Sequence, residues 1–232
     1  SRTRGVEIIK GAKTQHIHAT REVILSAGAF GTPQLLMLSG IGPEAHLKDK
    51  GIPVVMNAPN VGENLHDHLE AHIQVETSHP VSLNKYLKPH LMIWAGIQWF
   101  GWKGGVAAVN QCHVGAFIRS KQEITHPDIQ FHFFPILFGS NWIPDPLKNG
   151  YRLGSGPVRP ESRGTVRLTS SNPNDAPLID PSYLATENDW FVMREGLKFG
   201  RDLLEQPAFS KFHQREDIPG KHIKTDSDLN KY

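Results

Sequence analysis

The sequence is poor in cysteine, in charge of one sign and in long apolar runs. Its single cysteine, Cys112, excludes an intrachain disulfide and favours a reducing compartment. Its 25 basic and 23 acidic residues leave a net charge of +2, without the concentrated basic stripe of a nucleic-acid-binding protein. Its longest apolar stretch, residues 91–100, is about half the ~20 residues that a membrane-spanning helix needs. We therefore expect no nucleic-acid partner, and a core helix in place of a membrane span.

With 232 residues, the chain is long enough for one large domain or two small ones. Residues 57–64 are rich in Pro, Gly and Asn, which predicts a connection and a domain boundary, giving domains 1–60 and 61–232. The chain begins in a strand-like segment and ends where Thr225 and Asp228 have the spacing of a capping box. Because so short a terminal helix is unstable alone, we expect the chain to be a central fragment of a longer protein.

Three segments of the second domain alternate apolar and polar residues. In residues 69–76, Ile73 and Val75 fall on one face while Glu70 and His72 fall on the other. Residues 128–134 and 164–169 show the same period of two, and residues 114–119 form a further strand. Such half-polar strands predict an antiparallel sheet that packs on helices on one face and borders a cavity or water on the other.

The remaining segments complete the predicted architecture. We expect helices at 85–100 and 186–205, a hairpin within 5–23, a short helix at 43–50 followed by a strand at 52–56, and a long loop at 139–156 because that segment lacks periodicity.

The most informative segment is residues 22–43, which read EVILSAGAFGTPQLLMLSGIGP. The apolar run at its start predicts a buried strand, and a glycine turn follows. Thr32 is then expected to cap a helix with Pro33 at its first position and Gly40 just beyond its end. The whole string, with its SGIGP ending, closely resembles the second signature of the glucose–methanol–choline oxidoreductases, which oxidise alcohols with FAD.

Other strings occur in the order and rough spacing of that family, namely GAFIRS from 115, RPESRGTVRL from 159 and PLIDPSYL from 177. The resemblance implies an α/β (α+β) fold: part of a Rossmann-like FAD-binding domain in residues 1–60, and in residues 61–232 a substrate domain with a mostly antiparallel sheet and flanking helices. It also implies FAD as cofactor, with Ala27 and Gly28 near the flavin because glycine admits close approach.

The motif that begins at Asp67 and runs DHLE into the first alternating strand leaves three interpretations open. Its polar residues could line a solvated sheet face, or His68, Glu70 and His72 could bind a metal. No second group of cysteines or acids completes such a site, so we assign no metal. The third interpretation comes from the resemblance: DHLE is similar to the choline-oxidising members, whose glutamate pairs with the trimethylammonium group. That residue here is Glu70, with Trp94, Trp99 and Phe138 as candidates for cation–π contacts.

The string PDIQFHF from Pro127 is the second match to these enzymes. On sequence alone, its histidine is more simply a hydrogen-bonded member of a mixed sheet face. The resemblance implies instead that His132 lies near the substrate hydroxyl and stabilises the alkoxide, which makes it the candidate catalytic residue.

The resemblance also implies what this chain lacks. The family's G-x-G-x-x-G fingerprint and its C-terminal catalytic base are not present in the sequence. We therefore expect the chain alone to be inactive, and the parent protein to oxidise choline to betaine aldehyde and onward to glycine betaine, with an electron acceptor that the sequence does not identify. The expected location is cytoplasmic or peripheral on the inner membrane. The alternatives are a dehydrogenase for aliphatic or aromatic alcohols, and a non-catalytic His-rich metal-binding module.

Overall fold

The computed structural model describes residues 2–11, 13–110, 112–139 and 143–232, and it divides into two compact units. The first unit contains residues 1–66 and 162–183, and the second contains residues 67–161 and 184–232. The sequence placed a single boundary at residue 60, whereas the chain leaves the first unit after residue 66 and returns to it at 162. Hydrogen bonds between Leu65 and Gly164, and from the Leu168 amide to His46, join the returning segment to the first unit.

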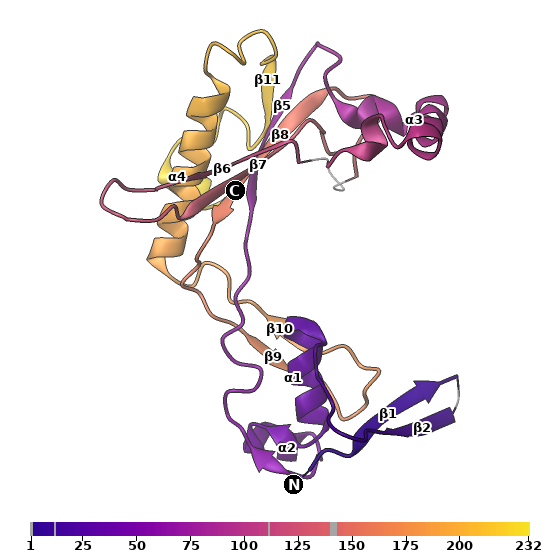
Figure 1. Cartoon of the computed structure of the whole chain (residues 1–232). Coiled ribbons are helices and arrows are strands. Elements are labelled where there is room, and N and C mark those ends of the chain that lie inside the picture. The colour runs from indigo at the N-terminus through magenta and orange to yellow at the C-terminus, as the bar shows by residue number, and fades with distance from the viewer. Residues whose placement is uncertain (1, 12, 111, 140–142) are drawn as a thin grey trace. The chain divides into compact units, whose positions relative to one another are not determined.

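The first unit holds a hairpin, two helices and two further strand pairs (Figure 1). Its elements are β1 (Gly5–Lys10), β2 (Lys13–His18), α1 (Gly28–Leu38), β3 (Ile41–Gly42), α2 (Glu44–Asp49), β4 (Met56–Asn57), β9 (Thr165–Arg167) and β10 (Leu178–Asp180). The expected hairpin and short helix are confirmed. The strand expected at 52–56 is reduced to the two residues of β4, which pair in parallel with β3.

The signature segment differs from its prediction in two respects. Residues 22–25 form no strand and Ile24 is 77% exposed, because a buried strand needs neighbours on both sides and no described strand pairs with this segment. Helix α1 begins at Gly28, so Thr32 and Pro33 lie inside it. The Thr32 hydroxyl does not cap the helix but accepts a hydrogen bond from the Ala27 amide at 3.0 Å, which holds the turn before α1.

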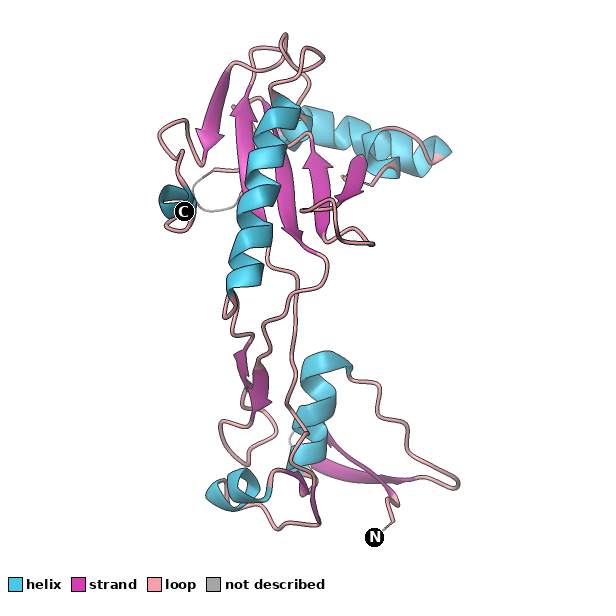
Figure 2. Ribbon diagram, turned by 90° about the vertical axis from the view of Figure 1, so that its left-hand side faces the viewer, coloured by secondary structure: helices cyan, strands magenta, loops and turns pink. Residues whose placement is uncertain are grey.

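The second unit is built on a five-stranded antiparallel sheet of order β11-β5-β8-β7-β6. Figure 2 shows α4 lying across one face of this sheet. The elements of the unit are β5 (Ala71–Glu76), the 3₁₀ helix η1 (Leu83–Leu87), α3 (Pro89–Trp102), η2 (Val106–Ala108), β6 (Val114–Ile118), β7 (Ile129–Phe134), β8 (Gly150–Pro157), α4 (Glu187–Leu204), β11 (Arg215–Ile218) and α5 (Asp226–Leu229).

The alternation read from residues 69–76 and 128–134 is confirmed in this sheet, whereas residues 164–169 contribute β9, which pairs with β10 in the first unit. Ile73, Val75, Ile129 and Phe131 are at most 1% exposed and pack with Leu197 of α4 into the main core. Burying such side chains stabilises the unit by roughly 1.5–3 kcal/mol each. Their polar neighbours in sequence therefore lie on the opposite face, which α4 does not cover. The predicted helix at 186–205 and the capping box of Thr225 and Asp228 are also confirmed.

The prediction of a long loop at 139–156 is wrong from residue 150 onward. Residues 150–157 form β8, the central strand, which is buried along its whole length and pairs with β5 on one side and β7 on the other. Its sequence GYRLGSGP shows no alternation, because side chains such as Glu70 and Leu137 lie over β8 on the face that α4 leaves uncovered, and glycines are present where these groups pack closely. Residues 140–142 lie outside the described residues.

No helix in the described part of the chain combines the length and the apolar character needed to cross a membrane.

Candidate functional site

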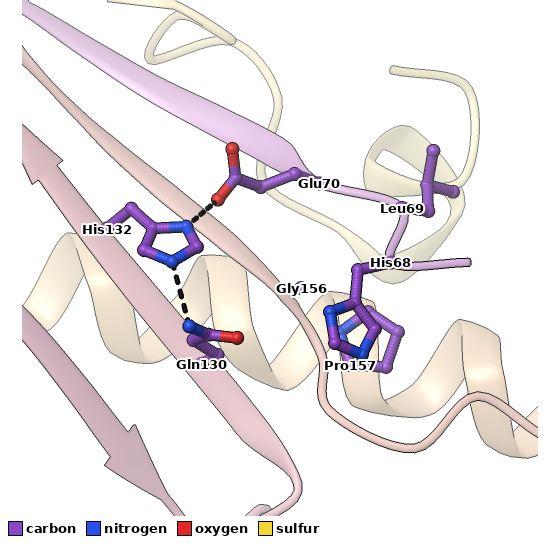
Figure 3. Close-up of a pocket in the computed structure, with 7 residues that line it drawn as sticks. All are labelled: His68, Leu69, Glu70, Gln130, His132, Gly156 and Pro157. Carbon is purple, nitrogen blue, oxygen red and sulfur yellow. Dashed lines mark hydrogen bonds and ion pairs between the residues drawn. The ribbon is translucent and has the colours of Figure 1, made fainter. Parts of the chain in front are cut away.

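Two of the residues singled out from the sequence, Glu70 and His132, meet on the open face of the sheet. They lie 62 positions apart in the chain. Glu70 immediately precedes β5, His132 lies in the middle of β7, and β8 runs between these two strands. His132 Nδ1 lies 2.5 Å from Glu70 Oε1, as Figure 3 shows. The antiparallel register thus brings an acid and an imidazole into direct contact.

A second hydrogen bond defines the other side of the imidazole ring. Gln130 Nε2 lies 2.8 Å from His132 Nε2 (Figure 3). The two hydrogen bonds fix the orientation of the ring: Nδ1 faces the Glu70 carboxylate, and Nε2 faces the Gln130 amide on the opposite side.

A cavity of about 190 Å³ lies beside this pair. Its lining consists of His68, Leu69, Glu70, Gln130, His132, Gly156 and Pro157 (Figure 3). The side chains of Glu70 and His132 are 26% and 36% exposed, so both are partly withdrawn from water while remaining accessible from the cavity. His68 Nε2 is hydrogen-bonded to the Val158 carbonyl oxygen at 2.9 Å, which links this edge of the cavity to the residue that follows β8.

The sequence did not predict a role for His72, which contributes to the same cluster from within β5. Its Nδ1 lies 3.6 Å from Glu70 Oε2, and its side chain is 12% exposed. Burial, followed by the nearby charge of Arg152, lowers the pKa of His72 from 6.5 to about 4. Near neutral pH this ring is therefore uncharged, and it adds no second cation next to the carboxylate.

The buried state of His72 predicts an acid-sensitive stability. The unfolded chain takes up the proton near pH 6.5 and the folded chain only near pH 4, so the free energy of unfolding falls as pH is lowered through this window. The loss from this one group is about 3 kcal/mol at most. Urea unfolding between pH 7 and 4 is expected to show a shallower decline for His72→Gln than for the parent. His113→Gln, at an exposed position, serves as control, and equal slopes for parent and His72→Gln would contradict the assignment.

The aromatic residues proposed for cation–π contacts are not part of this cavity. Trp94 and Trp99 lie on α3 with 48% and 38% exposure, and the guanidinium carbon of Arg152 lies 4.2 Å from the centre of the Phe138 ring. None of the three contributes to the described lining. Gln130 and Gly156, which the sequence did not single out, take part instead. The alternation of residues 128–134 placed Gln130 on the same face as His132, so the signal for Gln130 was present, whereas Gly156 lay within the expected loop.

The candidate cofactor residues lie in the first unit. Ala27 and Gly28 are exposed at the beginning of α1, where the first backbone N–H groups of a helix lack acceptors within it. Gly28 has φ +78°, and apart from its neighbours in the chain no atom lies within 4 Å of where its Cβ would stand. An open, side-chain-free backbone at a helix start fits the close approach of a flavin cofactor.

The alternative of a metal site finds no support in this geometry. Within the residues that the structure describes, no group of three or more His, Cys, Asp or Glu side chains is arranged to hold an ion.

The chain is similar to known proteins in both sequence and structure. Two sequence models of the GMC oxidoreductase family match the chain. One covers residues 1–70 and the other covers residues 160–232. The oxygen-dependent choline dehydrogenase of Brucella ovis is 40% identical over 228 residues, which cover 98% of this chain and 42% of that protein. The mitochondrial choline dehydrogenase of Homo sapiens is 41% identical over 233 residues, covering 100% of this chain and 39% of the relative. The chain thus spans about two fifths of the length of the curated relatives it matches.

Solved structures agree on the fold. A formate oxidase superimposes with a TM-score of 0.90 at 24% identity, over 99% of this chain and 45% of that one. The pyridoxine 4-oxidase of Mesorbium loti gives a TM-score of 0.80 at 24% identity, over 99% of this chain and 41% of that one.

Proposed function

Because this chain belongs to the GMC oxidoreductase family, we propose that the protein carrying it is an FAD-dependent alcohol dehydrogenase that oxidises choline to betaine aldehyde. FAD is the cofactor of this family, and Ala27 and Gly28 are the residues of this chain that would lie against it. When bound, the flavin supplies the hydride acceptor. The relatives named as choline dehydrogenases support choline as the substrate.

The observation that carries the proposal is the contact between Glu70 and His132 beside a single cavity. A carboxylate attracts a quaternary ammonium group, and partial burial reduces the screening by water that weakens this attraction at an open surface. An alcohol that also carries a cation needs both an anionic anchor and a group that bonds its hydroxyl. These two side chains supply one of each.

In the proposed mechanism, Glu70 binds the trimethylammonium group and holds the alcohol carbon in one orientation. Restricting the substrate in this way lowers the entropic part of the activation barrier. His132 donates a hydrogen bond from Nε2 to the substrate oxygen, at the position that the Gln130 amide occupies. A base supplied by the rest of the protein would take the hydroxyl proton, and the hydrogen bond from His132 strengthens as the alkoxide develops, while Glu70 orients the ring through Nδ1.

The test compares choline with 3,3-dimethylbutan-1-ol, in which a carbon atom replaces the charged nitrogen. Under anaerobic conditions the full-length flavoprotein is mixed with each alcohol and the flavin absorption is followed. We expect the second-order rate constant for flavin reduction by choline to be about tenfold or more above that for the neutral alcohol, because the carboxylate attracts only the cation. Equal values for the two alcohols would favour a dehydrogenase for aliphatic or aromatic alcohols.

A further inference from the structure

The carboxylate of Glu70 lies against a position of β8 that has no side chain. On the open face of the sheet, one row across the strands contains His72 of β5, Gly154 of β8, His132 of β7 and Gly115 of β6. Glu70 precedes β5, and its side chain extends over Gly154. A Cβ at position 154 would stand 2.5 Å from Glu70 Cδ and 2.6 and 2.7 Å from its two oxygens.

These distances leave no room for a side chain at position 154 while the Glu70 carboxylate keeps its present position. Non-bonded carbon atoms pack at about 3.5–4.0 Å, so a methyl group here would displace the carboxylate by roughly an ångström or more. The same carboxylate is bonded to His132 at 2.5 Å and lies 3.6 Å from His72. Displacing it would therefore break the contact that joins the acid to the imidazole.

We propose that Gly154 is a specificity-determining position: its bare backbone seats the Glu70 carboxylate between His72 and His132, and so gives the cavity its preference for a cationic alcohol. The preference for a cation rests on the proposed function. The seating of the carboxylate does not, since it follows from packing alone.

Whether Gly154 provides the space for the Glu70 carboxylate (its seating) is tested by thermal unfolding, independently of activity. Gly154→Ala is expected to lower the melting temperature of the protein by about 4 °C or more. In a Glu70→Ala background, where no carboxylate occupies the space, the same change should lower it by less than about 2 °C. Gly115→Ala is the matched control: it lies in the same row, on the edge strand, and its added Cβ would meet only the Phe131 carbonyl at 3.2 Å. Equal losses from Gly154→Ala in both backgrounds would overturn the seating.

The specificity is tested in the full-length flavoprotein by the ratio of kcat/KM for choline to that for 3,3-dimethylbutan-1-ol. We expect Gly154→Ala to reduce this ratio about tenfold or more and Gly115→Ala to leave it within about twofold. If Gly154→Ala does not yield a folded flavoprotein, the Glu70→Ala background decides the question instead. A folded Glu70→Ala, Gly154→Ala protein would show that the carboxylate is what excludes the side chain, and a double variant that also fails to fold would overturn the proposal.

The outcomes separate this inference from the proposed function. A wild-type protein that does not prefer choline would contradict the proposed function, while the unfolding comparison would still decide whether Gly154 seats Glu70. A wild-type protein that prefers choline, with a Gly154 variant that keeps the full preference, would overturn the specificity-determining role alone.

Discussion

Replacing Glu70 by glutamine is expected to lower kcat/KM for choline by about a hundredfold in the full-length protein, and for 3,3-dimethylbutan-1-ol by no more than about fivefold. A full charge pair at about 4 Å contributes roughly 4 kcal/mol at the effective dielectric constant of a partly buried site, and desolvation of the carboxylate offsets part of it. A remainder of about 2–3 kcal/mol corresponds to a loss of about 30- to 150-fold. Glutamine keeps the size of the side chain and an oxygen that can accept the proton of His132 Nδ1, so the neutral substrate loses little.

The measurement is steady-state kinetics with both alcohols, and Glu76→Gln is the control. Glu76 lies at the other end of the same strand and pairs with Arg215 at 2.7 Å, outside the described lining of the cavity. We expect Glu76→Gln to leave the ratio between the two substrates unchanged. Parallel losses on choline and on the neutral alcohol in Glu70→Gln would show that Glu70 acts only by supporting His132, and the cation-binding role would be withdrawn.

Replacing His132 by alanine is expected to lower kcat for both alcohols by about 100- to 1000-fold. A group that bonds the reacting oxygen stabilises the transition state more than the bound substrate, and the loss of one such donor has effects of this size. Because the hydroxyl is common to both alcohols, the ratio between them should change little. This pattern is the opposite of that expected for Glu70→Gln, so the two variants together assign the two roles.

Single-turnover flavin reduction separates this chemical step from product release. His113→Gln, an exposed histidine just before β6, is the control and should behave as the parent protein does. Retention of more than about a tenth of the parent's rate of flavin reduction in His132→Ala would remove His132 from the chemical step. A flavin content equal to that of the parent protein confirms that the variant is folded.

Glu70 and His132 could be singled out from the sequence because each lies in a segment that alternates polar and apolar residues and that resembles a motif of the family. Period two placed Glu70 and His72 on one face and Gln130 and His132 on another, and the structure confirms both faces. The same pattern did not show that these faces belong to neighbouring parts of one sheet. Strand order depends on which backbone edges pair, and an alternation of side chains carries no information on that.

The central strand shows why the rest could not be predicted. β8 separates β5 from β7, and without it Glu70 and His132 would have no common surface. Its glycines are unfavourable in strands taken alone, and they are present because other groups occupy the space of their side chains, as Glu70 does at Gly154. The signature segment shows the converse case: residues 22–25 have the composition of a buried strand, yet Ile24 and Leu25 remain exposed where no described strand pairs with them.

The sequence by itself determined the family, the cofactor, the polar and apolar faces of the strands, and the identities of the acid and the imidazole. These properties follow from short sequence motifs and from the periodicity of apolar residues, and neither depends on the chain being folded. Only the tertiary structure decided that Glu70, His72 and His132 meet, that Gln130 occupies the far side of the ring, and that Gly154 leaves the space between them. Those relations depend on pairing between segments up to about 80 residues apart, and the free energy that selects them comes from burying a core that no single segment contains.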